Sequence, residues 1–71
     1  MFDKLIDLTS QAQKLGKYRV RISYSPITDW LVEIHNGDNR VIRHQNVDPY
    51  CCAAAAYMAL TSHLLETYGG Y

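Results

Sequence analysis

The sequence predicts an α+β domain of element order α-β-β-β-α, in which a three-stranded antiparallel sheet carries both helices on one face. Three observations predict it: an apolar stripe of helical period at the N-terminus, central segments whose apolar residues alternate around a hairpin signal, and an Asp-Pro pair that opens an alanine-rich segment. Because the 71 residues are 48% hydrophobic and 20% charged, we expect one small globular domain over residues 1–71.

The N-terminal segment, residues 2–15, is predicted to be an amphipathic helix. Its apolar residues recur at spacings of three and four and so share one stripe: Phe2, Leu5, Leu8, Ala12 and Leu15, with Ile6 alongside. Gly16 follows the last of them, and glycine at this position is typical of a helix C-cap. The predicted helix therefore ends at Leu15.

Three strands are predicted to follow. Alternation over residues 18–24 and 30–35 directs one set of side chains to the core: Tyr18, Val20, Ile22, Tyr24, Trp30, Val32 and Ile34. Pro26 separates these two strands, and Asn36-Gly37 predicts a tight turn before a third strand in RVIRHQ. The length of that turn decides whether Val41 or Ile42 faces inward, and the sequence leaves both registers open.

The last helix is predicted to begin with Asp48 as N-cap and Pro49 as its first residue, and to run to about Thr67, where Tyr68-Gly69-Gly70-Tyr71 ends it. One face collects Ala53, Ala56, Tyr57, Leu60 and Leu64, with Met58, Thr61 and Leu65 beside them. The small alanines predict a helix that lies very close to the sheet.

Chemical function is not indicated by this composition. Cys51 and Cys52 begin a helix, which could lower their pKa values, but a nucleophile also needs a base and an oxyanion site, and no Cys-His spacing here is typical of one. The three histidines and two cysteines lack metal-ligand spacing, and no nucleotide-binding motif is present. We therefore expect no enzyme, no metal, no cofactor and no small-molecule substrate.

The cellular compartment is inferred from three features that the sequence lacks: a signal peptide, a membrane span and an ordinary disulfide. The N-terminus MFDKLIDLTSQ has no apolar core of a signal peptide, and no segment is apolar enough to span a membrane. Adjacent cysteines do not form an ordinary structural disulfide. We expect a cytoplasmic protein without a membrane partner.

A binding face is predicted on the side of the sheet opposite the helices. Six of the seven basic residues lie between residues 14 and 46, and the alternation directs many of them outward. The candidate binding residues are Arg19, Arg21, Glu33, His35, Arg40 and Arg43. Two interpretations stay open: a solvated face with Arg21 and Glu33 as cross-strand partners, or a mildly basic face that binds an acidic protein or a nucleic acid.

The element order and the segment AAAAYMALTSHLL resemble the double-stranded RNA-binding domain, whose alanine-rich final helix lies across a three-stranded sheet. The resemblance covers nearly the whole chain and implies that both helices pack on one sheet face. That family contacts phosphates with lysines at the start of its final helix, where this chain has Asp48-Pro49-Tyr50-Cys51-Cys52. It implies the fold here and not the RNA contacts.

The sequence thus predicts a small non-enzymatic interaction module that binds a protein partner or self-associates. A short chain without catalytic motifs would suit an accessory protein of a phage or mobile element. The alternative is nucleic-acid binding, to RNA or DNA, through the basic sheet face.

Overall fold

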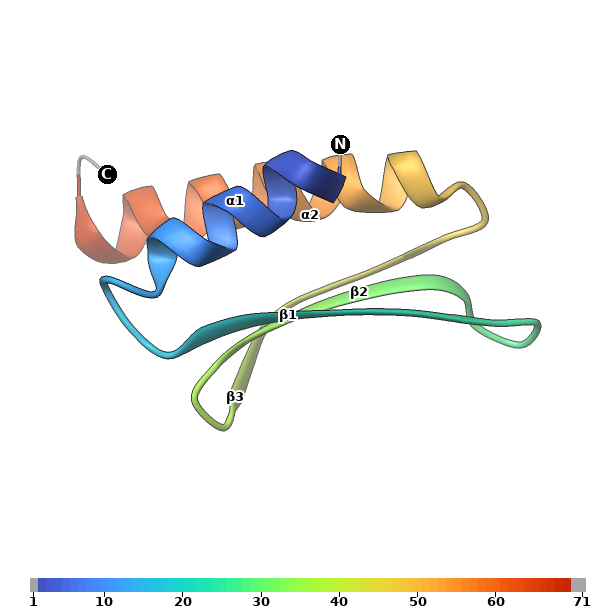
Figure 1. Cartoon of the computed structure of the whole chain (residues 1–71), viewed down its shortest axis with the longest axis horizontal. Helices are drawn as coiled ribbons and strands as arrows, with labels where there is room; N and C mark the ends of the chain where they lie inside the picture. Colours follow the sequence, from blue (N-terminus) through green and yellow to red (C-terminus); the bar gives the residue numbers. More distant parts are fainter. Residues whose placement is uncertain (1, 70–71) are drawn as a thin grey trace.

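The chain forms two layers, a sheet and a pair of helices. The structure is a computed structural model that describes residues 2–69, with α1 (Phe2–Ala12), β1 (Tyr18–Ser25), β2 (Asp29–Asn36), β3 (Asn39–Asn46) and α2 (Pro49–Tyr68). The strands form one antiparallel sheet in the order β1-β2-β3. Both helices lie over the same face of it (Figure 1), which confirms the predicted α-β-β-β-α architecture.

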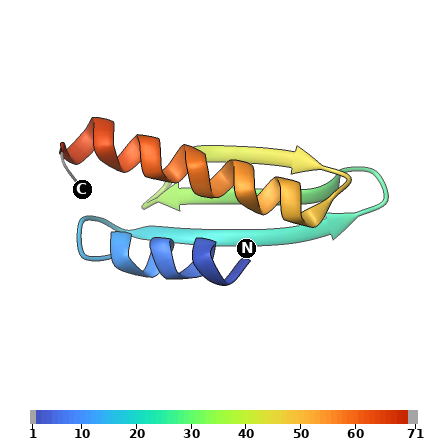
Figure 2. The same ribbon diagram turned by 90° about the horizontal axis from the view of Figure 1, so that it is seen from above.

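The helices run side by side in the same direction, with α1 over β1 and α2 over β2 and β3 (Figure 2). The core lies between the two layers and consists of twelve buried apolar residues: Leu5, Leu8, Ala12, Tyr18, Val32, Ile34, Ile42, Cys52, Ala53, Ala56, Leu60 and Leu64. Every element contributes to this one cluster, so residues 2–69 form a single core. Because both helices lie on one side of the sheet, the described residues leave its other face uncovered.

The close approach of α2 to the sheet is possible because its contact residues are small. Ala53 and Ala56 are completely buried, and Cys52 is 1% exposed with its Sγ donating to the carbonyl oxygens of Trp30 (3.5 Å) and His44 (3.2 Å). Asp48 caps the helix by accepting from Tyr50 N at 2.9 Å, with Pro49 following it as predicted. The prediction that this alanine segment is a packing surface is confirmed.

The opposite end of α2 differs little from the prediction. The helix continues through Tyr68, and Gly69 follows with a φ of 60° while its N–H donates to Leu65 O at 2.9 Å. The part of the predicted helix end at residues 70 and 71 lies outside the described residues. Met58 and Leu65, predicted beside the buried face, are instead 69% and 47% exposed on the outer side of the helix.

The first helix ends three residues earlier than predicted. Residues 13–15 form a turn in which Leu15 N donates to Ala12 O at 2.8 Å, so Leu15 leaves the apolar stripe and is 39% exposed. Gly16 is not a left-handed C-cap. The space that a side chain would occupy at Gly16 is crowded, since a Cβ atom there would lie 3.0 Å from both Asn36 Oδ1 and a Tyr18 ring carbon. Glycine is needed at this position for close approach.

The hairpin between β2 and β3 settles the register that the sequence left open. Gly37, with a φ of 63°, is the first of two turn residues, as a tight hairpin requires. Ile34 pairs with Ile42 and His35 pairs with Arg40, so Val41 is an extra residue in β3, a β-bulge. Ile42 therefore faces the core and is 8% exposed, while Val41 is only partly buried.

The tight helix–sheet contact predicts a large difference between two alanines of the same helix. Ala56→Leu adds bulk where the helix touches the sheet and should lower the free energy of unfolding by about 1–3 kcal/mol. Ala54→Leu adds the same bulk at a partly exposed position and should change it by less than about 0.5 kcal/mol. Urea unfolding followed by circular dichroism measures both, and equal losses would contradict the packing described here.

Candidate interaction surface

The uncovered face of the sheet brings all six predicted binding residues together. Strand pairing places Arg19, His35 and Arg40 in one row across the three strands, and Arg21, Glu33 and Arg43 in the next. A third row consists of Ser23, Leu31 and Gln45. We refer to Arg19, Arg21, Glu33, His35, Arg40 and Arg43 as the arginine face.

The bulge in β3 is the reason that two of these residues share the face. In a regular strand, Arg40 and Arg43 would point to opposite sides, because side chains alternate. The extra residue Val41 shifts the alternation by one, so both arginines point away from the helices. For the same reason His44 pairs with Val32 on the helix side of the sheet, and not on the face that carries His35.

The electrostatics of the face are dominated by four guanidinium groups around one carboxylate. Glu33 accepts from Arg40 Nη1 at 3.3 Å, and His35 Nε2 lies 4.0 Å from the same oxygen. Arg21 lies opposite Glu33 in the register as predicted, but the ion pair forms with Arg40 instead. The face therefore has an excess of positive charge at its centre.

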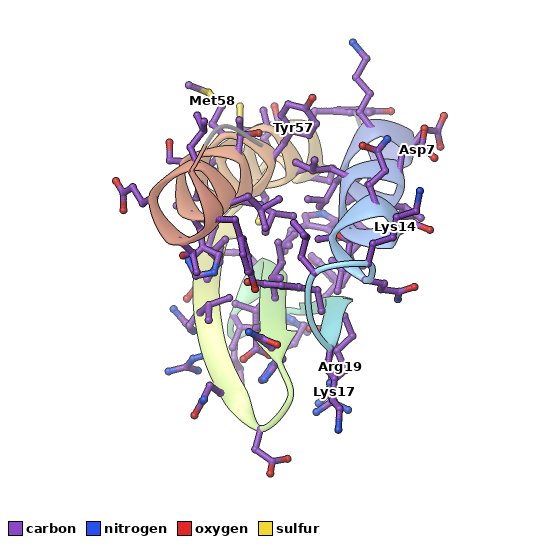
Figure 3. The ribbon with its side chains drawn as sticks, turned by 90° about the vertical axis from the view of Figure 1, so that its left-hand side faces the viewer. Asp7, Lys14, Lys17, Arg19, Tyr57 and Met58 are labelled. Carbon is purple, nitrogen blue, oxygen red and sulfur yellow. The ribbon has the colours of Figure 1, made fainter. Side chains whose placement is uncertain are left out.

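The arginines of β1 are the least constrained members of this set. Arg43 Nη2 donates to Gln45 Oε1 at 3.0 Å, whereas neither Arg19 nor Arg21 has a hydrogen-bond or ion-pair partner within residues 2–69. Figure 3 shows Arg19 and Lys17 extending away from the helix layer, while Lys14 lies on the side of α1. These β1 cations are available to an external anion.

Aromatic side chains gather elsewhere, at the end of the domain where both helices begin. The ring of Phe2 lies 6.4 Å from Trp30 and 6.3 Å from Tyr50, and Trp30 lies 5.1 Å from Tyr24. Tyr24 and Trp30 belong to the helix-facing side of the sheet, as predicted, yet Tyr24 is 58% exposed because the helices do not cover this end. This exposed cluster was not foreseen from the sequence.

Both cysteine thiols have raised pKa values. The carboxylate of Asp48 raises the pKa of the exposed Cys51 thiol, and burial raises the pKa of the Cys52 thiol. A helix start alone could have lowered these pKa values, but the N-cap carboxylate opposes the helix dipole at Cys51 and burial opposes it at Cys52. A protonated thiol is a poor nucleophile.

At the other end of the domain a partly buried hydrogen-bond chain joins α2, β1 and the α1–β1 turn. Tyr18 is 1% exposed, and its hydroxyl lies 2.9 Å from His63 Nε2 and 3.0 Å from the Tyr68 hydroxyl. Tyr68 donates to Leu15 O at 3.3 Å, so its oxygen accepts from Tyr18, which accepts from His63. Every oxygen in the chain is satisfied, which makes it a structural feature that fixes the C-terminal half of α2 to β1 and the α1–β1 turn.

A depression of about 290 Å³ lies between the two helices. It is lined by Lys4, Asp7, Leu8, Gln11 and Tyr57. Asp7 is the one carboxylate among these lining residues, so the depression lacks the pair of acids that general acid–base chemistry commonly uses. Within residues 2–69, no group of three or more histidine, cysteine or acidic side chains is placed to hold a metal ion.

Comparison with known proteins gives no match: no family model matches the chain, and neither a curated protein nor a solved structure matches it. The element order is the one implied by the resemblance to the double-stranded RNA-binding domain, but no comparison identifies that family. In the described part of the chain, neither helix has a stretch long and apolar enough to cross a lipid bilayer.

The Tyr18 hydroxyl predicts alkaline destabilisation. Burial, followed by the hydrogen bond to Tyr68, raises its pKa to about 12, whereas tyrosine in an unfolded chain titrates near 10. The neutral phenol therefore stabilises the fold fully below about pH 10, and this contribution is lost as the pH rises towards about 12.

Urea unfolding of wild type and Tyr18→Phe between about pH 8 and 11 tests this. The stability of the wild type should fall more steeply with pH than that of the variant, since phenylalanine does not titrate. Tyr24→Phe removes an exposed hydroxyl and serves as the control. Parallel pH profiles for wild type and Tyr18→Phe would show that Tyr18 makes no such contribution.

Proposed function

We propose that this domain is a non-enzymatic interaction module that binds an acidic segment of a protein partner on the arginine face. The observation that carries the proposal is that four arginines share one uncovered sheet face with a single carboxylate. Arginine is the cation best suited to this task, because its planar guanidinium binds a carboxylate through two parallel hydrogen bonds.

The unpaired state of Arg19 and Arg21 supports a binding role for the β1 side of the face. A stabilising surface ion pair would have used the Glu33 carboxylate opposite Arg21, but that carboxylate is taken by Arg40 on β3. The cations of β1 thus contribute nothing evident to the stability of the isolated domain. Leu31 lies in the adjacent row and is partly buried, so a partner meets both charged and apolar surface.

Nucleic-acid binding is the second candidate, and the same four arginines favour it because they could neutralise backbone phosphates. The distribution of rings argues for a protein. Single-strand binders stack bases on aromatic side chains, and here Tyr18, Tyr24 and Trp30 all belong to the opposite side of the sheet. The acidic protein segment is therefore the preferred ligand.

Fluorescence anisotropy with two probes, poly-L-glutamate and a 20-base-pair RNA duplex, tests the proposal. We expect poly-L-glutamate to bind at low salt and to be weakened at least tenfold by Arg21→Glu. Lys14→Glu makes the same charge change in the turn after α1, away from the arginine face (Figure 3), and should weaken binding by less than about threefold.

Three outcomes would contradict this proposal. If only the duplex binds, with Arg21 required, the nucleic-acid candidate replaces the protein partner. If neither probe binds at low salt, the arginine face is a solvated surface. Equal losses in the Arg21→Glu and Lys14→Glu variants would show that overall charge, and not this face, attracts the probe.

A further inference from the structure

The end of the domain that carries the exposed aromatic cluster has the opposite character from the arginine face. We define the aromatic end as Phe2, Tyr24, Ile27, Trp30, Val47 and Tyr50. Four of its side chains are largely in solvent: Ile27 is 89% exposed, Val47 74%, Tyr50 66% and Tyr24 58%. Together they expose on the order of 500 Å², the size at which an apolar patch on a small protein usually has a binding role.

The elements explain why these residues meet. Ile27 occupies the turn between β1 and β2, and Val47 lies between β3 and α2. Both connections are at the same end of the sheet, beside the first residues of α2 (Figures 1 and 2). Nothing in residues 2–69 covers these side chains, although the core nearby is complete.

The charge at this end is negative. Asp29 begins β2 directly after the turn that holds Ile27, Asp48 follows Val47 in the connection to α2, and Asp3 follows Phe2. No lysine or arginine occurs between residues 22 and 39 or between residues 44 and 69. The aromatic end therefore combines rings with carboxylates, whereas the arginine face combines unpaired guanidinium groups with Leu31.

We propose that the partner of the arginine face is the aromatic end of a second copy of this chain, so that copies associate head to tail. This inference rests on the proposed function, because it identifies the acidic segment that the arginine face binds. Guanidinium groups pack on the faces of tyrosine and tryptophan and pair with carboxylates, and Arg19 and Arg21 lack partners of their own.

This geometry has a defined consequence for assembly. The two surfaces lie on different parts of one molecule, so the contact is heterologous and an assembly of any size still offers one free surface of each kind. Assembly is therefore open-ended and grows with protein concentration. It also weakens with added salt, because the charges at both surfaces are solvent-exposed.

Sedimentation velocity of three variants tests the proposal. Arg21→Glu alters the arginine face, and the double variant Ile27→Lys, Val47→Lys places cations on the aromatic end at the two most exposed positions. Wild type should increase in mass between about 10 μM and 1 mM, while each altered protein alone should remain monomeric. Met58→Lys changes an equally exposed apolar residue on the outer side of α2 (Figure 3) and should assemble like wild type.

Mixing the two altered proteins gives the decisive result. Each retains one intact surface, so an equimolar mixture should form a one-to-one dimer and nothing larger. A mixture that remains monomeric would overturn head-to-tail association, as would loss of assembly in Met58→Lys with assembly intact in the double variant.

Failure of this inference is distinguishable from failure of the proposed function. A wild-type protein that stays monomeric at 1 mM yet binds poly-L-glutamate through Arg21 has an acidic partner other than itself. A monomeric protein that binds no acidic probe contradicts both proposals.

Discussion

The contact between α2 and the sheet depends on the small size of the buried side chains of α2. Ala53 and Ala56 are completely buried with only a methyl group as side chain, and at Cys52 a small thiol reaches two strand carbonyl groups. Because α2 covers β2 and β3, the space over β1 is left for α1, and the two helices together form the helix layer. The rest of the architecture follows: one core on one side, and a second side of the sheet that no part of the described chain covers.

The two ends of the helix layer are finished in different ways. At the C-terminal end of α2, partly buried hydrogen bonds run from His63 through Tyr18 and Tyr68 to Leu15 and hold the helix to β1 and to the α1–β1 turn. At the N-terminal end, aromatic rings contact one another at tilted angles, and those of Tyr24 and Tyr50 are mostly exposed. This small domain thus has its polar side-chain contacts at one end and its exposed rings at the other.

Periodicity in the sequence was sufficient to predict the five elements, the buried alanines and the side of the sheet on which most residues lie. It predicts which way a side chain points, but not how far a neighbouring element extends. Tyr24 therefore appeared as a core residue and is mostly exposed, since the helices do not reach the end of β1. Leu15 kept the helical spacing, yet the helix ends at Ala12 because the chain must turn back to bury Tyr18.

The positions of the candidate binding residues were predicted better than the contacts between them. All six lie on one face of the sheet. Arg40 and Arg43 share that face only because of the bulge in β3, which no sequence pattern specifies, since it depends on the turn adopted at Gly37. For the same reason the Glu33 ion pair formed with Arg40 and not with its opposite neighbour, Arg21.

Val41 also divides β3 into two parts whose side-chain directions are independent of each other. From Ile42 onward the alternation of the side chains is fixed by packing in the core, whereas before Val41 it is constrained only by the solvent-facing side of the sheet. Losing or gaining one amino acid near the hairpin would reorient Arg40 while leaving the packing of Ile42 untouched. Related chains can therefore be expected to differ in the charge displayed at this corner through changes of length, without any replacement inside the hydrophobic interior.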